Sequence, residues 1–107
     1  MIKYPYPEQQ PNDVRDVMRY FATCYEQKNG SYLPDKYWKR MGGYIVRLQN
    51  QEDLTLEELT LLIFGVFNTK PEVKSIGYIQ YFIDKLDDYR ELKQQWEEQQ
   101  NNVSEIP

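Results

Sequence analysis

Four basic residues suited to binding an anion or an acidic partner fall within one stretch of the sequence, DKYWKRMGGYIVRLQ (residues 35–49). At about 100° per residue of a helix, Lys36, Arg40, Gly43 and Arg47 share one stripe, and Lys39 flanks it. A glycine at the centre of such a stripe lets a strand or helix of a partner approach the backbone. The basic stripe is therefore either a contact surface for an acidic or phosphate-bearing partner or a solvated face.

Two adjacent glycines, Gly42 and Gly43, raise the alternative of a turn that divides this helix. Helical phase favours a continuous helix, because one apolar face persists on both sides of the pair. Gly42 lies nearer that apolar flank, so close packing against another helix explains it better. We expect a helix from Lys36 to about Gln49, with tyrosines 37 and 44 on its flank and an apolar face formed by Trp38, Met41, Ile45 and Leu48.

Arg15 and Arg19 are four residues apart on the polar face of an earlier helix. They either extend the basic surface or form ion pairs with acidic neighbours such as Asp16 and Glu26. Together with the basic stripe they define a second hypothesis, a nucleic-acid-binding surface whose affinity would fall steeply with salt.

Most signatures of catalysis are missing from the sequence. It contains no histidine, which removes the commonest general base and metal ligand. Cys24 is the single cysteine, and no glycine-rich phosphate loop is present. Adjacent carboxylates on a helix point about 100° apart, so they do not converge on one ion or bond. We expect no enzymatic activity, no metal, no cofactor and no small-molecule substrate.

A second stripe, of aromatic residues, lies toward the C-terminus. On a continuous helix Tyr78, Tyr89 and Trp96 fall within about 20° of one direction. They form either the edge of the core or a contact face for a protein partner, because the acidic residues nearby disfavour nucleic acid.

Charge is distributed unevenly along the 107 residues. Residues 1–50 carry eight basic and five acidic side chains, a net charge of +3, whereas residues 51–107 carry five and twelve, a net charge of −7. The overall charge of −4 argues against bulk attraction to nucleic acid but permits a local basic surface. No run of about 18 apolar residues predicts a membrane helix. With a lone cysteine, the chain is expected to be cytoplasmic.

Four helices are predicted from periodicity and end signals. The first runs from Asp13 to about Gln27, with Asn12 as its N-cap and Gly30 as its stop. Asp35 is expected to cap the second. The third, from Leu56 to about Asn68, follows a capping box formed by Thr55 and Glu58, and its apolar residues surround it, which is typical of a buried central helix. The fourth opens at Pro71 or Ser75 and extends to about Gln100.

Both ends of the chain lack the helical periodicity of its middle. Residues 1–12 contain YPYPEQQP and predict an extended arm, and residues 101–107 predict a disordered tail. Between them, residues 13–100 form a single domain. The expected fold is all-α, a compact bundle of about four helices with a long C-terminal helix.

The segment SIGYIQYFIDKL (residues 75–86) resembles the C-terminal helix of DnaD-like replication proteins. Ser75, the pair Tyr78-Ile79 and the pair Phe82-Ile83 match that family's motif, while Leu86 stands where the family commonly has a tryptophan. The similarity covers about residues 59–89. It implies a helical module of replication initiation or helicase loading in a phage, plasmid or Gram-positive bacterium.

The sequence therefore predicts a small non-enzymatic interaction module, with a protein partner or self-association as its mode of action and an accessory role in a phage, plasmid or conjugative element. The alternative is a DNA-binding or replication-associated protein that uses the basic stripe.

Overall fold

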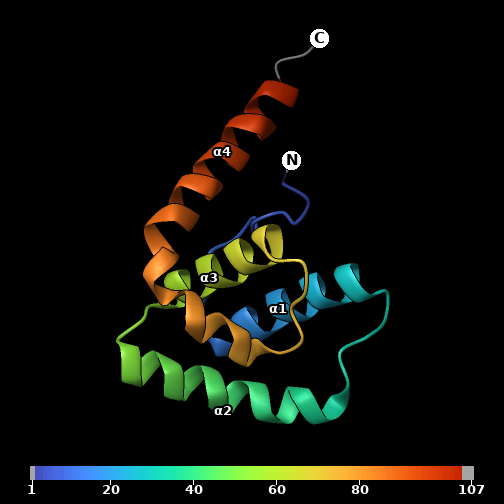
Figure 1. Ribbon diagram of the computed structural model, residues 1–107, viewed down its shortest axis with the longest axis vertical. Coiled ribbons are helices and arrows are strands. Elements are labelled where there is room, and N and C mark those ends of the chain that lie inside the picture. Colours follow the sequence, from blue (N-terminus) through green and yellow to red (C-terminus); the bar gives the residue numbers. More distant parts are fainter. Residues whose placement is uncertain (1, 105–107) are drawn as a thin grey trace.

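The computed structural model describes the backbone of residues 2–104 and the side chains of residues 2–101. This part of the chain contains no strand and forms α1 (Val14–Asn29), α2 (Asp35–Glu52), α3 (Leu56–Thr69), the 3-10 helix η1 (Ile76–Lys85) and α4 (Leu86–Ser104). Along the 46 Å long axis, α2 lies at one end and α4 at the other, with α1 and α3 between them (Figure 1). The predicted all-α bundle with a long C-terminal helix is confirmed.

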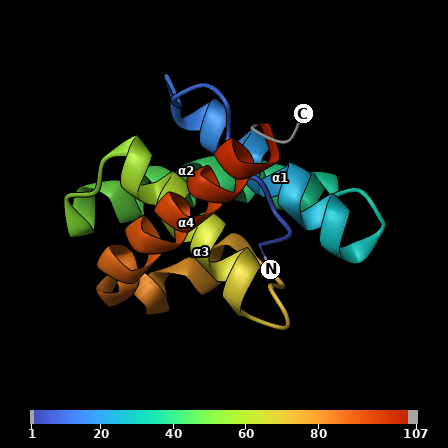
Figure 2. The same cartoon turned by 90° about the horizontal axis from the view of Figure 1, so that it is seen from above.

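The third helix is the centre of the molecule, as its apolar circumference predicts. Every residue from Leu59 to Phe67 is buried, and α3 packs against α1, η1 and α4. Seen along the long axis, α4 overlies α3 (Figure 2). The predicted capping box is present: the Thr55 hydroxyl accepts from the Glu58 N–H at 3.0 Å, and the Glu58 carboxylate accepts from the Thr55 N–H at 2.9 Å.

Helix α2 continues through its two glycines. A Cβ atom at Gly42 would lie 3.4 Å from the Sδ atom of Met18, so Gly42 faces α1, whereas a Cβ at Gly43 would meet no atom within 4 Å. Met41, Ile45 and Leu48 are buried as the apolar face of α2. The prediction of one unbroken helix is confirmed.

Two predicted helix caps are wrong by one residue. The N-cap of α1 is Asp13 rather than Asn12, and its carboxylate accepts from the Asp16 N–H at 2.9 Å. Asp35 is the first residue of α2, and Pro34 occupies the cap position without a capping hydrogen bond. The predicted stop of α1 is confirmed, since Gly30 has a φ of 72° and its N–H donates to the Glu26 carbonyl.

The N-terminal arm is extended but is part of the core. Tyr4 and Tyr6 are 7% and 4% exposed. The Tyr4 ring lies 5.6 Å from the Phe67 ring, and the Tyr6 ring lies 5.5 Å edge-on to Phe64. The Lys93 ammonium lies 4.4 Å from the centre of the Tyr6 ring, so the arm contacts α4 as well as α3.

The side chain of Asn68 fastens this arm to the end of α3. Its Oδ1 atom accepts from the N–H groups of Lys3 and Tyr4 at 3.0 and 2.9 Å. Its Nδ2 atom donates to the carbonyls of Tyr4 and Phe64 at 3.0 and 2.9 Å. The amide therefore pairs both backbone groups of Tyr4, as a neighbouring β-strand would.

The predicted single fourth helix is wrong, because the segment divides into η1 and α4. Phe82 interrupts η1 with non-helical dihedrals of φ −121° and ψ 17°. Residues 76–83, IGYIQYFI, are mostly β-branched or aromatic, with weak helix preference, so tertiary packing decides their conformation. Helix α4 continues to Ser104, past the predicted end at Gln100. Of the predicted disordered tail, residues 105–107 lie outside the described residues.

At Gly65 the backbone of α3 lies directly against a side chain of α4. A Cβ atom placed there would overlap the ring of Tyr89, which is 4% exposed. Tyr89 is thus a core residue, and its proposed role as a contact aromatic is wrong. The close approach expected of a glycine is found here, between α3 and α4, as well as at Gly42.

Replacing Gly65 by alanine should lower the free energy of unfolding by about 1–3 kcal/mol, because the new methyl group overpacks the contact with Tyr89. Gly43→Ala is the matched control: its site is helical and open, so it should raise the free energy of unfolding by about 0.5–1 kcal/mol. Urea unfolding followed by circular dichroism measures both. Equal stability of Gly65→Ala and the wild type would contradict the described packing.

Asn68→Ala should lower the free energy of unfolding by about 1–3 kcal/mol, because it leaves the part-buried N–H and C=O groups of Tyr4 without partners. The arm should then detach, and trypsin should cleave after Lys3 faster than in the wild type. Asn12→Ala is the control, since Asn12 is exposed and its side chain makes no hydrogen bond within the described residues. Its effect should stay within about 0.5 kcal/mol. An arm that remains protease-resistant in Asn68→Ala would show that the amide is dispensable.

Candidate functional site

A groove with a volume of about 630 Å³ lies between α2 and the start of η1. We call it the α2 groove. Its size falls within the range of about 300–1,000 Å³ that is typical of ligand sites. It is lined by the following residues: Phe21, Leu33, Tyr37, Lys39, Arg40, Met41, Gly43, Tyr44, Arg47, Ser75, Ile76 and Gly77.

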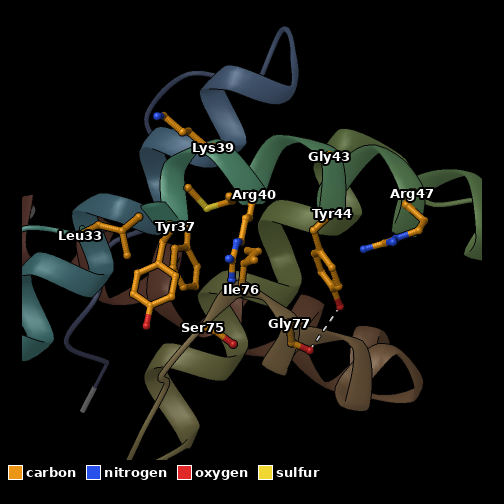
Figure 3. Close-up of a pocket in the computed structure, with 12 residues that line it drawn as sticks. Leu33, Tyr37, Lys39, Arg40, Gly43, Tyr44, Arg47, Ser75, Ile76 and Gly77 are labelled. Atoms are coloured by element: carbon orange, nitrogen blue, oxygen red, sulfur yellow. Dashed lines mark hydrogen bonds between the residues drawn. The ribbon is translucent and has the colours of Figure 1, made fainter. Parts of the chain in front are cut away.

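One wall of the groove is a single face of α2. Tyr37, Arg40, Tyr44 and Arg47 follow one another at spacings of three, four and three residues, which places them in line along the helix. Figure 3 shows the Arg40 side chain descending between the two tyrosines toward Ile76. The Arg47 guanidinium lies 5.9 Å from the centre of the Tyr44 ring, close enough for a cation–π interaction.

The opposite wall is the segment Ser75–Gly77, where η1 begins. The Tyr44 hydroxyl donates to the Gly77 carbonyl at 3.2 Å and joins the two walls (Figure 3). Burial raises the pKa of Tyr44, the neighbouring Tyr81 phenol acts in the same direction, and Arg47 opposes both. The phenol therefore stays protonated at neutral pH and can keep donating this bond.

Aromatic and cationic side chains alternate along the groove. Leu33 and Tyr37 lie at the N-terminal end of the α2 wall, and Arg40 and Arg47 follow along it (Figure 3). Leu33 and Met41 are 4% and 1% exposed, so they form a floor rather than an accessible surface. The lining thus offers burial for an apolar group beside positive charge.

The cations of this groove lack acidic partners among residues 2–101. No aspartate or glutamate is among the described residues that line it. Among residues 2–101, Lys39, Arg40 and Arg47 form no ion pair. Elsewhere in the chain, Arg90 lies within 3.4 Å of Glu58 and 3.1 Å of Asp87, and Lys93 within 3.6 Å of Glu97. The groove is therefore a region of positive potential on a chain of net charge −4.

The structure divides the residues of the predicted basic stripe. Lys39, Arg40, Gly43 and Arg47 line the α2 groove, although the Lys39 ammonium extends away from the tyrosines (Figure 3). Lys36 is exposed but outside the groove, with its Nζ atom 5.3 Å from the centre of the Tyr37 ring.

Arg15 and Arg19 do not join this surface. Both are exposed on α1, and neither lines the α2 groove. The Arg19 guanidinium lies 3.9 Å from the Asp16 carboxylate, as expected if Arg19 forms an ion pair within α1.

The aromatic stripe does not exist as one face. The division between η1 and α4 separates Tyr78 from the other two residues, and Tyr89 is buried. Trp96 is half-buried with its ring 6.3 Å from Phe64, and Tyr78 is half-buried with its ring 5.1 Å from Phe82. Both lie at the edge of the core. Tyr81, which sequence analysis did not single out, is 69% exposed.

Two features bear on metal binding and on membranes. Among the described residues, no group of three or more histidine, cysteine, aspartate or glutamate side chains is placed to hold a metal ion. Within the same part of the chain, no helix combines the length and apolar character needed to cross a membrane.

Cys24 is buried in α1, and burial raises the pKa of its thiol to about 12, against the opposing effect of a hydrogen bond with Tyr20. At pH 8 the native protein should therefore react with Ellman's reagent about a thousandfold more slowly than an ordinary thiol of pKa 9.0. Added urea should restore the ordinary rate. Because the unfolded thiol ionises near pH 9 and the folded one near 12, stability should decline as the pH rises above 9. Rapid labelling without urea would contradict this burial.

Comparison with known proteins adds no family to this description: no protein-family model matches the chain, and neither the curated proteins nor the solved structures give a significant match.

Proposed function

We propose that this chain is a small helical interaction module, without enzymatic activity, that binds a segment of a protein partner in the α2 groove. The observation that carries the proposal is the combination of half-buried apolar lining residues with Arg40 and Arg47, two cations that have no acidic partner within the described residues. Unpaired cations beside an apolar surface do not stabilise the folded chain. A partner that buries apolar surface there and supplies carboxylates gains from both features.

A protein segment suits this groove better than nucleic acid does. The net charge of −4, concentrated in the acidic second half of the chain, disfavours bulk attraction to a phosphate backbone. The half-buried side chains of Tyr37, Tyr44 and Ile76 line the groove and can contact an apolar side chain of a partner. The groove volume of about 630 Å³ can hold a few residues of a peptide but does not form a large flat interface.

One observation favours nucleic acid as a second candidate. Tyrosines and arginines alternate along the α2 wall, and single strands are bound by aromatic rings that stack on bases between cations. The two candidates differ in their response to salt, since binding through phosphates weakens steeply as salt rises.

The cellular setting is also a proposal. The resemblance of residues 59–89 to DnaD-like replication proteins supports an accessory role in a phage, plasmid or conjugative element, in the cytoplasm. Self-association remains one form of the proposed protein contact, because the outer face of α4 carries exposed acidic residues such as Asp88 and Glu91.

Reversing the two groove charges, Arg40→Glu together with Arg47→Glu, should abolish selection of peptides from a display library. We expect the wild type to enrich peptides that compete with one another for one site, and the double variant to bind them at least about tenfold more weakly. Fluorescence polarisation of the enriched peptides measures the affinity.

The matched control is Arg15→Glu with Arg19→Glu, which makes the same change in net charge on exposed residues outside the groove. It should bind the peptides like the wild type. If no peptide is enriched, or if the control loses binding equally, the proposal fails. A labelled 20-nucleotide single strand, titrated at low salt, tests the second candidate: binding that only the groove variant loses would favour nucleic acid.

A further inference from the structure

We infer that the partner bound at the α2 groove is a second copy of this chain, which presents the outer face of its α4, so that copies associate head to tail. This inference rests on the proposed function and names its partner. It uses the unpaired carboxylates of α4, the unpaired cations of the groove and the position of these two helices at opposite ends of the molecule.

The outer face of α4 carries carboxylates that have no cationic partner. Residues 86–101 contain five acidic and two basic side chains, and both basic side chains form ion pairs with carboxylates of the same chain. Asp88, Glu91 and Glu98 are exposed and form no ion pair within residues 2–101. At about 100° per residue they fall within about 80° of one direction, away from the buried Tyr89.

The cations of the α2 groove complement this acidic face. Arg40 and Arg47 are exposed and also form no ion pair in the described part of the chain. The acidic residues of α2, Asp35 and Glu52, are its first and last residues, so neither lies between the arginines. Gly43 does lie between them, and a Cβ atom there would meet nothing within 4 Å. An acidic helix can therefore lie across the opening of the groove without entering between its walls.

The two charged surfaces are separated within one molecule. Helix α2 lies at one end of the 46 Å long axis, and the C-terminal half of α4 extends past α3 at the other end (Figure 1). The carboxylates of α4 therefore lie far from the groove of their own chain. In a second copy the same carboxylates can reach it, so the chain itself supplies a surface of complementary charge.

The contact between two copies is heterologous, because each copy contributes a different surface. A copy that binds with its groove keeps its own α4 free, and a copy that binds with α4 keeps its groove free. Association therefore continues head to tail, into open chains or closed rings, and does not stop at a two-fold dimer. An exposed ion pair contributes little by itself and is screened by salt, so the association should be weak and strongest at low salt.

Sedimentation velocity of the full chain tests the inference. At about 30 mM NaCl the average mass should rise above the 13.0 kDa of one chain as the protein concentration increases to about 1 mM, and at about 500 mM NaCl it should not rise. A chain that stays monomeric at low salt throughout this range would overturn the inference. Equal association at both salt concentrations would also overturn it, because charge would not be the cause.

Two neutralised variants identify the surfaces. Arg40→Gln with Arg47→Gln removes charge from the groove, and Glu91→Gln with Glu98→Gln removes charge from α4. Each variant alone should stay monomeric. A mixture of the two should form a complex of one copy of each and nothing larger, since only one groove and one α4 face remain complete. Association of either variant alone, or no complex in the mixture, would overturn the head-to-tail contact.

The matched controls neutralise the same number of charges elsewhere. Arg15→Gln with Arg19→Gln and Glu8→Gln with Glu57→Gln change exposed residues outside both surfaces. Both controls should associate like the wild type, and equal loss of association in either would overturn the inference. Circular dichroism verifies that each variant is folded, and the salt series on the wild type stands by itself if one is not.

The failures of this inference and of the proposed function differ. If the chain stays monomeric while display-selected peptides bind in the groove, the second copy is excluded and the interaction module stands. If the chain stays monomeric and no peptide is enriched, the proposed function fails as well.

Discussion

A helix that is apolar around its whole circumference must be covered on every side, and this requirement on α3 organises the rest of the molecule. Leu59 through Phe67 are buried without interruption. Helix α1, η1 and α4 cover three directions. The N-terminal arm contributes Tyr4 and Tyr6 against Phe67 and Phe64. Helix α2 does not need to cover α3 to the same degree. It packs on α1 and η1, and so keeps one face available for the groove.

Local signals in the sequence predict the helices, and tertiary contacts explain where prediction fails. The capping box at Thr55 and the stop at Gly30 act within a few residues of their helices, so both are confirmed. The break at Phe82 depends on packing of a segment with weak helix preference, which periodicity does not reveal. The arm contains prolines and reads as extended, but its tyrosines pack on α3 and its backbone bonds to Asn68, more than sixty residues away in the chain. Gly65 has no local signal for its contact with Tyr89.

The candidate site is predictable only in its α2 half. A stripe of Arg40, Gly43 and Arg47 follows from helical phase, and the spacing of Tyr37 and Tyr44 beside it is visible in the same stretch. The opposite wall, Ser75–Gly77, comes from a segment more than thirty residues later, and only the fold brings it to Tyr44. The same fold shows that Arg15 and Arg19 belong to another surface. Sequence therefore indicated the charge of the site but not its shape or its apolar floor.

The attachment of the arm by Asn68 has a consequence for synthesis. During translation Tyr4 and Tyr6 precede the amide and rings that receive them by about sixty residues, and they precede Lys93 by more. Helices form locally as they emerge, but these tyrosines have no place to dock until α3 is complete. Prolines 5, 7 and 11 hold this waiting segment away from helical and central-strand pairing. Because a proline has no N–H to donate, these positions disfavour strand pairing of the aromatic stretch with other chains before its own core exists.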